Sequence, residues 1–212
     1  MSENLLGELA VKPVPEAMTM SQLAELGERY DNPQDRALFY FCYLTGARIS
    51  EALDVTPGDI EKHRNEKLGE YLTVRLLTRK NRRAKIRDVP VPMQQLEKTM
   101  VSYVNKWVSV SEGSIFPGLS RTNAWNRLSR IKITVRAIHG KEIIQDLNKG
   151  VNPHYLRHCR LTHLVQHYGF NELQLMRFAG WTNTRPAIVY VHLNWMDLAK
   201  VMSQASNEGL SW

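Results

Sequence analysis

Residues 153–191 read PHYLRHCRLTHLVQHYGFNELQLMRFAGWTNTRPAIVYV, and this stretch decides how the second half of the chain is interpreted. Gly, Pro and Asn residues divide it into segments that predict helices over 153–168 and 171–179. Arg157 follows His154 by three residues. On a helix beginning near Pro153 the two side chains would share one face. That spacing allows both to reach the same phosphate, although His154 could equally be a helix-start residue while Arg157 caps a carbonyl or pairs with a carboxylate.

Tyr190, near the end of this stretch, has the spacing of a nucleophile directed at a phosphate. A phosphodiester repels nucleophiles unless donors neutralise its oxygens, and arginine, histidine and an indole N–H can do so without a metal. Trp181 would supply the indole. Each residue also has a simpler interpretation, because Trp181 could fill the core and Tyr190 could pack with its hydroxyl on a carbonyl.

Upstream, residues 45–53 read TGARISEAL and provide a second guanidinium in Arg48. Two arginines can bind both non-bridging oxygens of a phosphate, a geometry that lysine does not reproduce. Glu51 lies one helical turn after Arg48. We expect Glu51 to hold the Arg48 side chain in place, although an ordinary ion pair on a solvated helix face would have the same spacing.

A basic β-hairpin is predicted between these two regions. Residues 71–78 and 85–89 have the composition of strands, and 79–87 contains six basic residues in nine. Such a run can be a solvated face, but its charge density also suits contact with a DNA backbone. A lysine at the tip could protonate a leaving oxygen, with Lys80 the first choice and Lys85 the second. The expected DNA-binding residues are Arg79, Arg82, Arg83, Lys85 and Arg87.

The remaining segments are predicted to be largely helical. Residues 1–18 form an arm or linker, and Thr19 and Gln22 have the spacing of a capping box at a helix start. Asn32-Pro33 opens a second helix that stops at Gly46, so the first seventy residues are expected to be helical. Further helices are expected over 92–109, 120–139, 183–191 and 195–205. The fold class is therefore mainly α with a small antiparallel β-hairpin or sheet, in one domain over 19–212.

Charge and cysteine usage restrict the function. Residues 1–70 hold 7 Lys and Arg against 13 Asp and Glu, whereas 71–212 hold 21 against 8. The later segment is thus suited to a polyanion, and the absence of a long apolar run or signal-peptide core favours nucleic acid over a membrane. Cys42 and Cys159 are expected in the core of a protein of a reducing, cytoplasmic interior, with a reactive thiol at Cys159 as the less favoured alternative.

Histidine pairs at helical spacing raise the question of a metal. His154 and His158, and likewise His163 and His167, are four residues apart. Neither pair encloses a glutamate, and no Cys or carboxylate cluster completes a zinc site. We therefore expect no metal and no cofactor.

Together these motifs resemble the catalytic domain of tyrosine site-specific recombinases, the family of phage integrases and Xer-type resolvases. The resemblance extends from about Thr19 to Asp197, and the Gly-Trp and Tyr-Val-His-Leu ending is similar to archaeal plasmid and virus integrases. It implies that Tyr190 forms a 3′-phosphotyrosyl link without metal or nucleotide. It also implies that Arg48 and Arg157 hold the phosphate, that His154 and Trp181 assist, and that Lys80 is the general acid.

The resemblance also implies double-stranded DNA as the partner and self-assembly into dimers or tetramers on DNA. Two departures stand out. No separate core-binding domain is expected, because eighteen N-terminal residues cannot encode one, and the hairpin is longer than usual after Lys80. A type IB topoisomerase and a non-catalytic DNA-binding protein are the alternative functions. Formation of a four-way junction from two sites would favour a recombinase, whereas relaxation alone would favour a topoisomerase.

Overall fold

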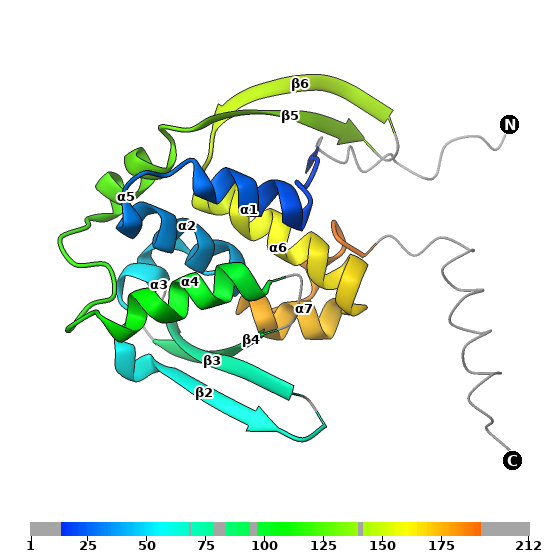
Figure 1. Cartoon of the computed structure of the whole chain (residues 1–212). Helices are drawn as coiled ribbons and strands as arrows, with labels where there is room; N and C mark the ends of the chain where they lie inside the picture. Colours follow the sequence, from blue (N-terminus) through cyan, green and yellow to red (C-terminus); the bar gives the residue numbers. More distant parts are fainter. Residues whose placement is uncertain (1–13, 68, 79–83, 94–96, 140–141, 192–212) are drawn as a thin grey trace, which may run out of the picture. The chain divides into compact units, whose positions relative to one another are not determined.

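The computed structural model describes residues 14–67, 69–78, 84–93, 97–139 and 142–191 (Figure 1). The chain divides into two compact units, residues 1–162 and 163–212, and each is described by itself. Among the described residues no helix has the length and apolar character needed to cross a membrane.

The first unit begins with the predicted helices. At the start of α1 (Met20–Glu28) the Thr19 hydroxyl oxygen accepts from the Gln22 N–H, and the Gln22 side-chain oxygen accepts from the Thr19 N–H, which confirms the capping box. The Asn32 side chain caps the start of α2 (Pro33–Thr45). The helix ends at Gly46, whose φ of 58° is the left-handed conformation that glycine adopts readily. The short helix α3 (Ile49–Leu53) and the 3₁₀ turn η1 (Pro57–Asp59) follow.

A three-stranded antiparallel sheet follows, in the order β2-β3-β4. The predicted hairpin is confirmed as β3 (Gly69–Thr78) and β4 (Lys85–Pro92), with Leu72 opposite Val91 and Val74 opposite Val89. β2 (Ile60–Asn65) corrects the expectation that the first seventy residues are helical. Its sequence IEKHRN is polar and lacks a strand pattern, so its conformation depends on pairing with β3.

A second sheet contradicts the expected helix over 120–139. Only α5 (Arg121–Leu128) is helical there, and it is followed by β5 (Lys132–His139) and β6 (Glu142–Gly150). The three consecutive β-branched residues at 133–135 suit a strand, and the strand replaces the expected helix because β6 supplies a backbone partner along the whole length. Figure 1 shows the two strands as a long curved hairpin. Similarly, the helix expected over 92–109 is confirmed only as α4 (Lys98–Ser109).

Residues 14–16, predicted as part of an arm, are attached to the first unit. β1 (Val14–Pro15) pairs with β5, and the backbone N–H of Glu16 donates to the carbonyl of Arg136 at 2.7 Å. The Tyr155 hydroxyl donates to the Glu16 carbonyl at 2.9 Å, and His158 Nε2 lies 2.6 Å from the Pro15 carbonyl oxygen. The helix that carries Arg157 therefore also holds the start of the described chain.

The core of the first unit is built around α2, whose residues Ala37–Thr45 are all buried. Aromatic rings of α2 make edge contacts with neighbouring elements, as between Phe41 and Phe116 at 5.5 Å. α4 packs against α2, as Figure 1 shows. Burial on every side of α2 makes it the rigid support for the loop that follows Gly46.

The predicted helix over 153–168 is confirmed as α6 (Pro153–Tyr168), which continues from the first unit into the second. In the second unit α7 (Glu172–Ala179) is capped by Asn171 and ends at Gly180, with φ of 67°. The helix expected over 183–191 is wrong in extent, since only the 3₁₀ turn η2 (Arg185–Ala187) forms, with Pro186 inside it. The helix expected over 195–205 lies outside the described residues.

Candidate active site

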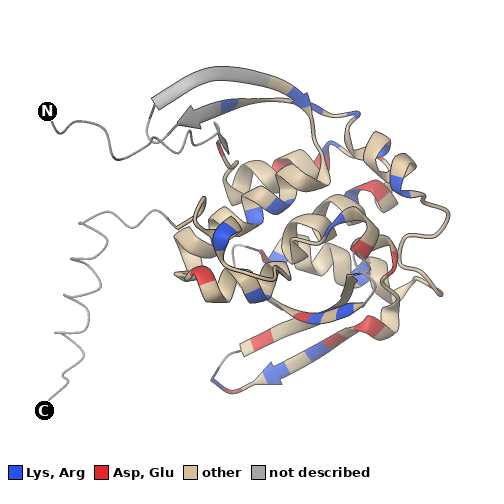
Figure 2. Cartoon of the chain, turned by 180° about the vertical axis from the view of Figure 1, so that it is seen from behind, with Lys and Arg blue, Asp and Glu red and all other residues tan. Residues whose placement is uncertain are grey.

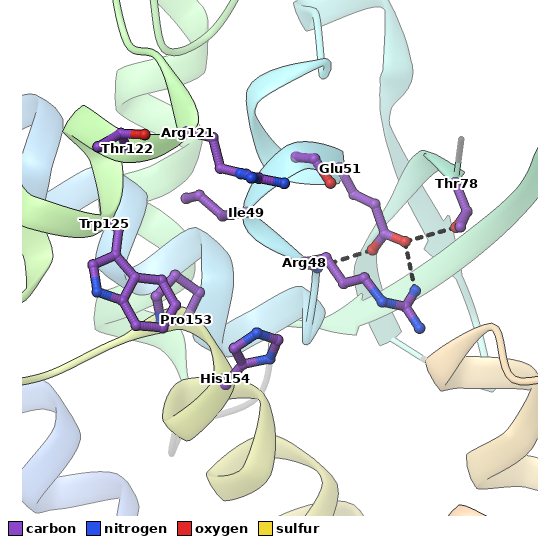
Figure 3. A pocket seen from close by; sticks show the side chains of 10 residues that line it. Arg48, Ile49, Glu51, Thr78, Arg121, Thr122, Trp125, Pro153 and His154 are labelled. Carbon is purple, nitrogen blue, oxygen red and sulfur yellow. Dashed lines mark hydrogen bonds and ion pairs between the residues drawn. The ribbon is translucent and has the colours of Figure 1, made fainter. Parts of the chain in front are cut away.

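A cavity of about 720 Å³ lies in the first unit, at the meeting point of α3, the end of β3, α5 and the start of α6 (Figure 3). Two of the predicted catalytic residues, Arg48 and His154, line it, as does the predicted supporting residue Glu51. Its lining comprises Arg48, Ile49, Ser50, Glu51, Thr78, Arg121, Thr122, Trp125, Pro153 and His154.

Arg48 is held at the edge of this cavity by Glu51. Its backbone is extended at the N-cap of α3, and its N–H donates to Glu51 Oε2 at 2.9 Å. The guanidinium Nη1 binds Glu51 Oε1 at 2.8 Å, while about a quarter of the side chain, 26%, stays exposed. This arrangement fixes one side of the guanidinium and leaves the other accessible to an anion.

Glu51 is buried and accepts hydrogen bonds from residues of three elements. Thr78 Oγ1 donates to Oε1 at 2.6 Å, and Arg87 binds both carboxylate oxygens, at 3.0 and 2.7 Å. Burial by itself raises the pKa of the Glu51 carboxyl, but the hydrogen bonds from Arg87 and Thr78 and the charge of Arg87 outweigh it and lower the pKa to about 2. Glu51 is therefore ionised and acts as the anchor of the cluster.

The position of Arg87 differs from that expected for a DNA-contact residue. Only 9% of its side chain is exposed, and its guanidinium is directed to Glu51 and Thr78. We therefore assign Arg87 to positioning Glu51. Figure 2 shows acidic and basic residues interleaved along the same sheet, where Lys62 pairs with Glu70 and Arg75 with Asp88.

Arg157 lies beside the loop that carries Arg48. It is 7% exposed, and its Nη1 donates to the carbonyl of Gly46 at 2.5 Å across 111 residues of sequence. Gly46 can present that carbonyl because its left-handed backbone turns the chain sharply after α2. His154, one helical turn before Arg157, is exposed to the cavity.

In the second unit the structure brings Trp181 and Tyr190 together. Their rings are stacked, with centroids 6.2 Å apart and planes inclined by 24°. Trp181 follows the Gly180 cap, and its backbone N–H donates to the Met176 carbonyl at 3.0 Å. Both side chains are half-buried, so neither is enclosed in the core.

Of the predicted hairpin residues, Lys85 and Arg87 belong to the described part of the chain. Arg79, Lys80, Arg82 and Arg83 lie outside the described residues. Lys85, at the start of β4, is exposed. The choice between Lys80 and Lys85 as general acid stays a prediction.

The surroundings of the cysteines and histidines bear on two alternatives, a reactive thiol and a metal site. Both thiols are buried and unbridged, and burial raises the pKa of Cys42 to about 12 and that of Cys159 to about 11. These raised pKa values argue against a reactive thiolate at Cys159. Within the described ranges, no group of three or more His, Cys, Asp or Glu side chains could hold a metal ion.

The lining residues that sequence reasoning did not single out include Thr78, Arg121 and Trp125. Arg121 and Trp125 are separated by one turn of α5, and this spacing was a usable signal that they share a face. Thr78 gave no such signal, because its role depends on the register of β3 against β4.

Residues 16–196 match the sequence profile of the phage integrase family. The chain belongs to this family. Among curated proteins it is 27% identical over 176 residues to the tyrosine recombinase XerC of Proteus mirabilis, covering 81% of this chain and 52% of that protein. It is also 27% identical to XerC of Actinobacillus pleuropneumoniae serotype 7 (strain AP76) over 207 residues, with 92% and 60% covered. The chain thus spans little more than half the length of these phage integrase family relatives.

Solved recombinase structures have the same fold. XerA recombinase matches with a TM-score of 0.56 at 18% identity, covering 91% of this chain and 65% of the other. XerH recombinase bound to its difH substrate matches with a TM-score of 0.59 at 17% identity, covering 92% and 56%. These matches confirm the mainly helical fold class with small antiparallel sheets.

Proposed function

We propose that this chain cleaves and rejoins DNA strands with Tyr190 as the nucleophile. The Tyr190 oxygen forms a bond to phosphorus, the bond from phosphorus to the 5′ oxygen breaks, and a 3′-phosphotyrosyl link results. The phenol proton passes to water, and the departing 5′ oxygen takes its proton from a lysine of the hairpin. Because the covalent link conserves the phosphodiester, attack by another 5′ hydroxyl reverses the step and rejoins DNA.

The observation that supports this proposal best is the hydrogen bond from Arg157 to the Gly46 carbonyl. It joins α6 to the loop that leads into Arg48, so that the backbone positions of the two arginines, distant in sequence, are held near each other. Such a pair can neutralise both non-bridging oxygens of a phosphate.

The remaining roles follow from the chemistry of each side chain. His154 would donate a hydrogen bond to the phosphate, and Trp181 would donate its indole N–H. A lysine of the hairpin, Lys80 before Lys85, would protonate the 5′ oxygen. Glu51 would not touch DNA but would orient Arg48.

Double-stranded DNA is the proposed partner. The XerH structure and a Tn1549 transposon integrase structure, with TM-scores of 0.59 and 0.56 to this chain, were solved in complex with DNA. We propose that the chain assembles with further copies on DNA for site-specific recombination, or for integration and excision of mobile DNA.

The test uses a pool of random-sequence duplexes nicked near one end, so that a cleaved fragment diffuses away and the adduct accumulates. Wild-type protein should yield an SDS-resistant protein–DNA adduct, and Tyr190→Phe should lose it. Tyr168→Phe is the matched control and should keep the adduct. An adduct that persists in Tyr190→Phe, or whose peptide maps to Tyr155 or Tyr168, would refute the assignment.

A further inference from the structure

The His154 ring has one aromatic neighbour among the described residues, the indole of Trp125. The ring centroids are 5.9 Å apart with an interplanar angle of 63°, a T-shaped arrangement. This is a preferred geometry for aromatic pairs, because the positive edge of one ring faces the negative face of the other. Both residues line the cavity (Figure 3).

We propose that Trp125 is a positioning residue that orients the His154 imidazole toward the phosphate. The inference rests on the proposed function and adds a residue to it. Trp125 acts through His154 and is not itself a catalytic residue.

His154 has few other restraints. It lies in the first turn of α6, directly after Pro153, and is exposed. Across the described ranges no hydrogen bond or ion pair holds its imidazole. Without a neighbour such a side chain would populate several rotamers, and a donor that must meet a phosphate oxygen would lose much of its effect.

Trp125, in contrast, projects from a helix that is firmly attached to the core. Arg127, on the next half-turn of α5, binds Asp35 of α2 at 2.8 Å and Gln34 at 3.0 Å. The carbonyl of Leu128 accepts a hydrogen bond from the buried Tyr30 hydroxyl at 2.7 Å. α5 therefore gives the indole a fixed origin, as expected for a side chain that positions another.

The exposure of Trp125 also needs an explanation. The side chain is 37% exposed, whereas Trp107 of the same unit is partly buried, with its Nε1–H donating to the Ile115 carbonyl at 2.7 Å. The contact between the Trp125 and His154 rings in the wall of the cavity accounts for the position of Trp125. Arg121 and Thr122 line the same wall one turn earlier on α5.

The first test is NMR of protein labelled with ¹³C at histidine Cε1. The His154 resonance is assigned by its loss in His154→Gln. The indole ring current should shift this resonance in wild type, and Trp125→Ala should remove the shift while Trp125→Phe retains part of it. Asn126→Ala is the matched control, because Asn126 is exposed on the same helix and does not line the cavity. An unchanged His154 resonance in Trp125→Ala would overturn the proposal.

The second test measures single-turnover cleavage of the nicked random-sequence duplex pool at saturating protein, together with the Kd for the same duplexes. Trp125→Ala should slow cleavage about 10- to 100-fold with Kd nearly unchanged, because a misoriented donor affects the transition state and not binding. Trp125→Phe should recover most of the rate.

The outcomes separate the two proposals. A Kd that weakens as much as the rate would show that Trp125 contacts DNA directly, and an unchanged rate would show that His154 does not need it. Either result overturns the positioning role. If wild-type protein forms no adduct, the proposed function fails, while the NMR comparison still decides whether Trp125 orients His154.

Discussion

At the scale of single residues, Glu51 is the buried carboxylate that binds two arginine side chains beside the cavity. Its carboxylate is bound by Arg48, Thr78 and Arg87, and only 2% of its side chain is exposed. A buried carboxylate is tolerated when charged donors surround it, and the pair with Arg87 provides most of that compensation. As a result, the Arg48 side chain keeps a fixed orientation while part of it stays exposed to solvent.

The lowered pKa of Glu51 predicts a pH dependence of stability. Because its folded pKa is about 2 and that of a free glutamate is 4.5, its stabilising contribution is complete above pH 4.5 and is lost as the pH falls toward 2. The pKa difference corresponds to about 3 kcal/mol. Glu51→Gln should therefore lower the free energy of unfolding at pH 7 and flatten its decline between pH 5 and pH 2.

Urea unfolding at a series of pH values measures this effect. Glu25→Gln, which alters an exposed glutamate of α1, is the control and should follow wild type. Equal pH slopes for wild type and Glu51→Gln would contradict the ionised, donor-bound state of Glu51.

The general acid can be identified at the same scale by changing the leaving group. A 5′-bridging sulfur needs little protonation, so it should restore cleavage by the variant that lacks the acid. If Lys80 is the acid, the sulfur substrate should rescue Lys80→Ala and leave any defect of Lys85→Ala in place. The measurement is the cleavage rate of each variant on oxygen and sulfur substrates. Rescue of Lys85→Ala alone would transfer the role to Lys85.

At the scale of elements, α6 carries residues of the candidate site at its start and packs into the core one turn later. It presents His154 to the cavity and Arg157 to the Gly46 loop, and one turn later its fully buried Arg160 pairs with Glu97 at the start of α4. The Arg160 guanidinium also lies 5.7 Å from the centre of the Tyr43 ring of α2. This pair fixes α6 against two helices and so fixes the residues that precede it.

The buried pair predicts a large effect of removing one partner. Glu97→Gln should destabilise the protein by about 3–5 kcal/mol, because a buried guanidinium loses its counter-charge. The double variant Glu97→Leu/Arg160→Met should recover much of this loss. Chemical denaturation measures both, with Lys98→Ala, at an exposed neighbour, as control. A Glu97→Gln protein as stable as wild type would refute the role of the pair.

At the scale of the whole molecule, the charge is distributed unevenly along the sequence. Residues 71–212 carry 21 Lys and Arg against 8 Asp and Glu, while several strand residues are already paired, as Arg75 is with Asp88. This excess of positive charge is what a DNA backbone would meet. Release of counterions from DNA should then make binding depend strongly on salt.

The prediction is that affinity for a random-sequence duplex falls steeply as the salt concentration rises. Lys85→Ala, which removes an exposed hairpin cation, should reduce the slope of log K against log salt by about 1. Arg75→Ala should change it less, because Arg75 pairs with Asp88. Fluorescence anisotropy at several salt concentrations gives the slopes, and a salt-independent affinity would exclude the electrostatic mode of binding.

The sequence alone determined the elements whose signals are local. The Thr19 capping box, the Gly46 and Gly180 helix ends and the β3–β4 hairpin depend on a few neighbouring residues, and all were predicted. Five of the predicted site residues could also be singled out from the sequence, because each lies in a short motif: Arg48, His154, Arg157, Trp181 and Tyr190.

Only the tertiary structure decided the features that depend on distant partners. β2 and the β5–β6 hairpin form through backbone pairing that local propensity alone does not specify, which is why 132–139 was expected to be helical. Arg87 is held by Glu51 and not directed outward, and Trp125 meets His154, because packing brings together elements far apart in the chain. A side chain's type limits its chemistry, whereas its neighbours in space decide which part of that chemistry it performs.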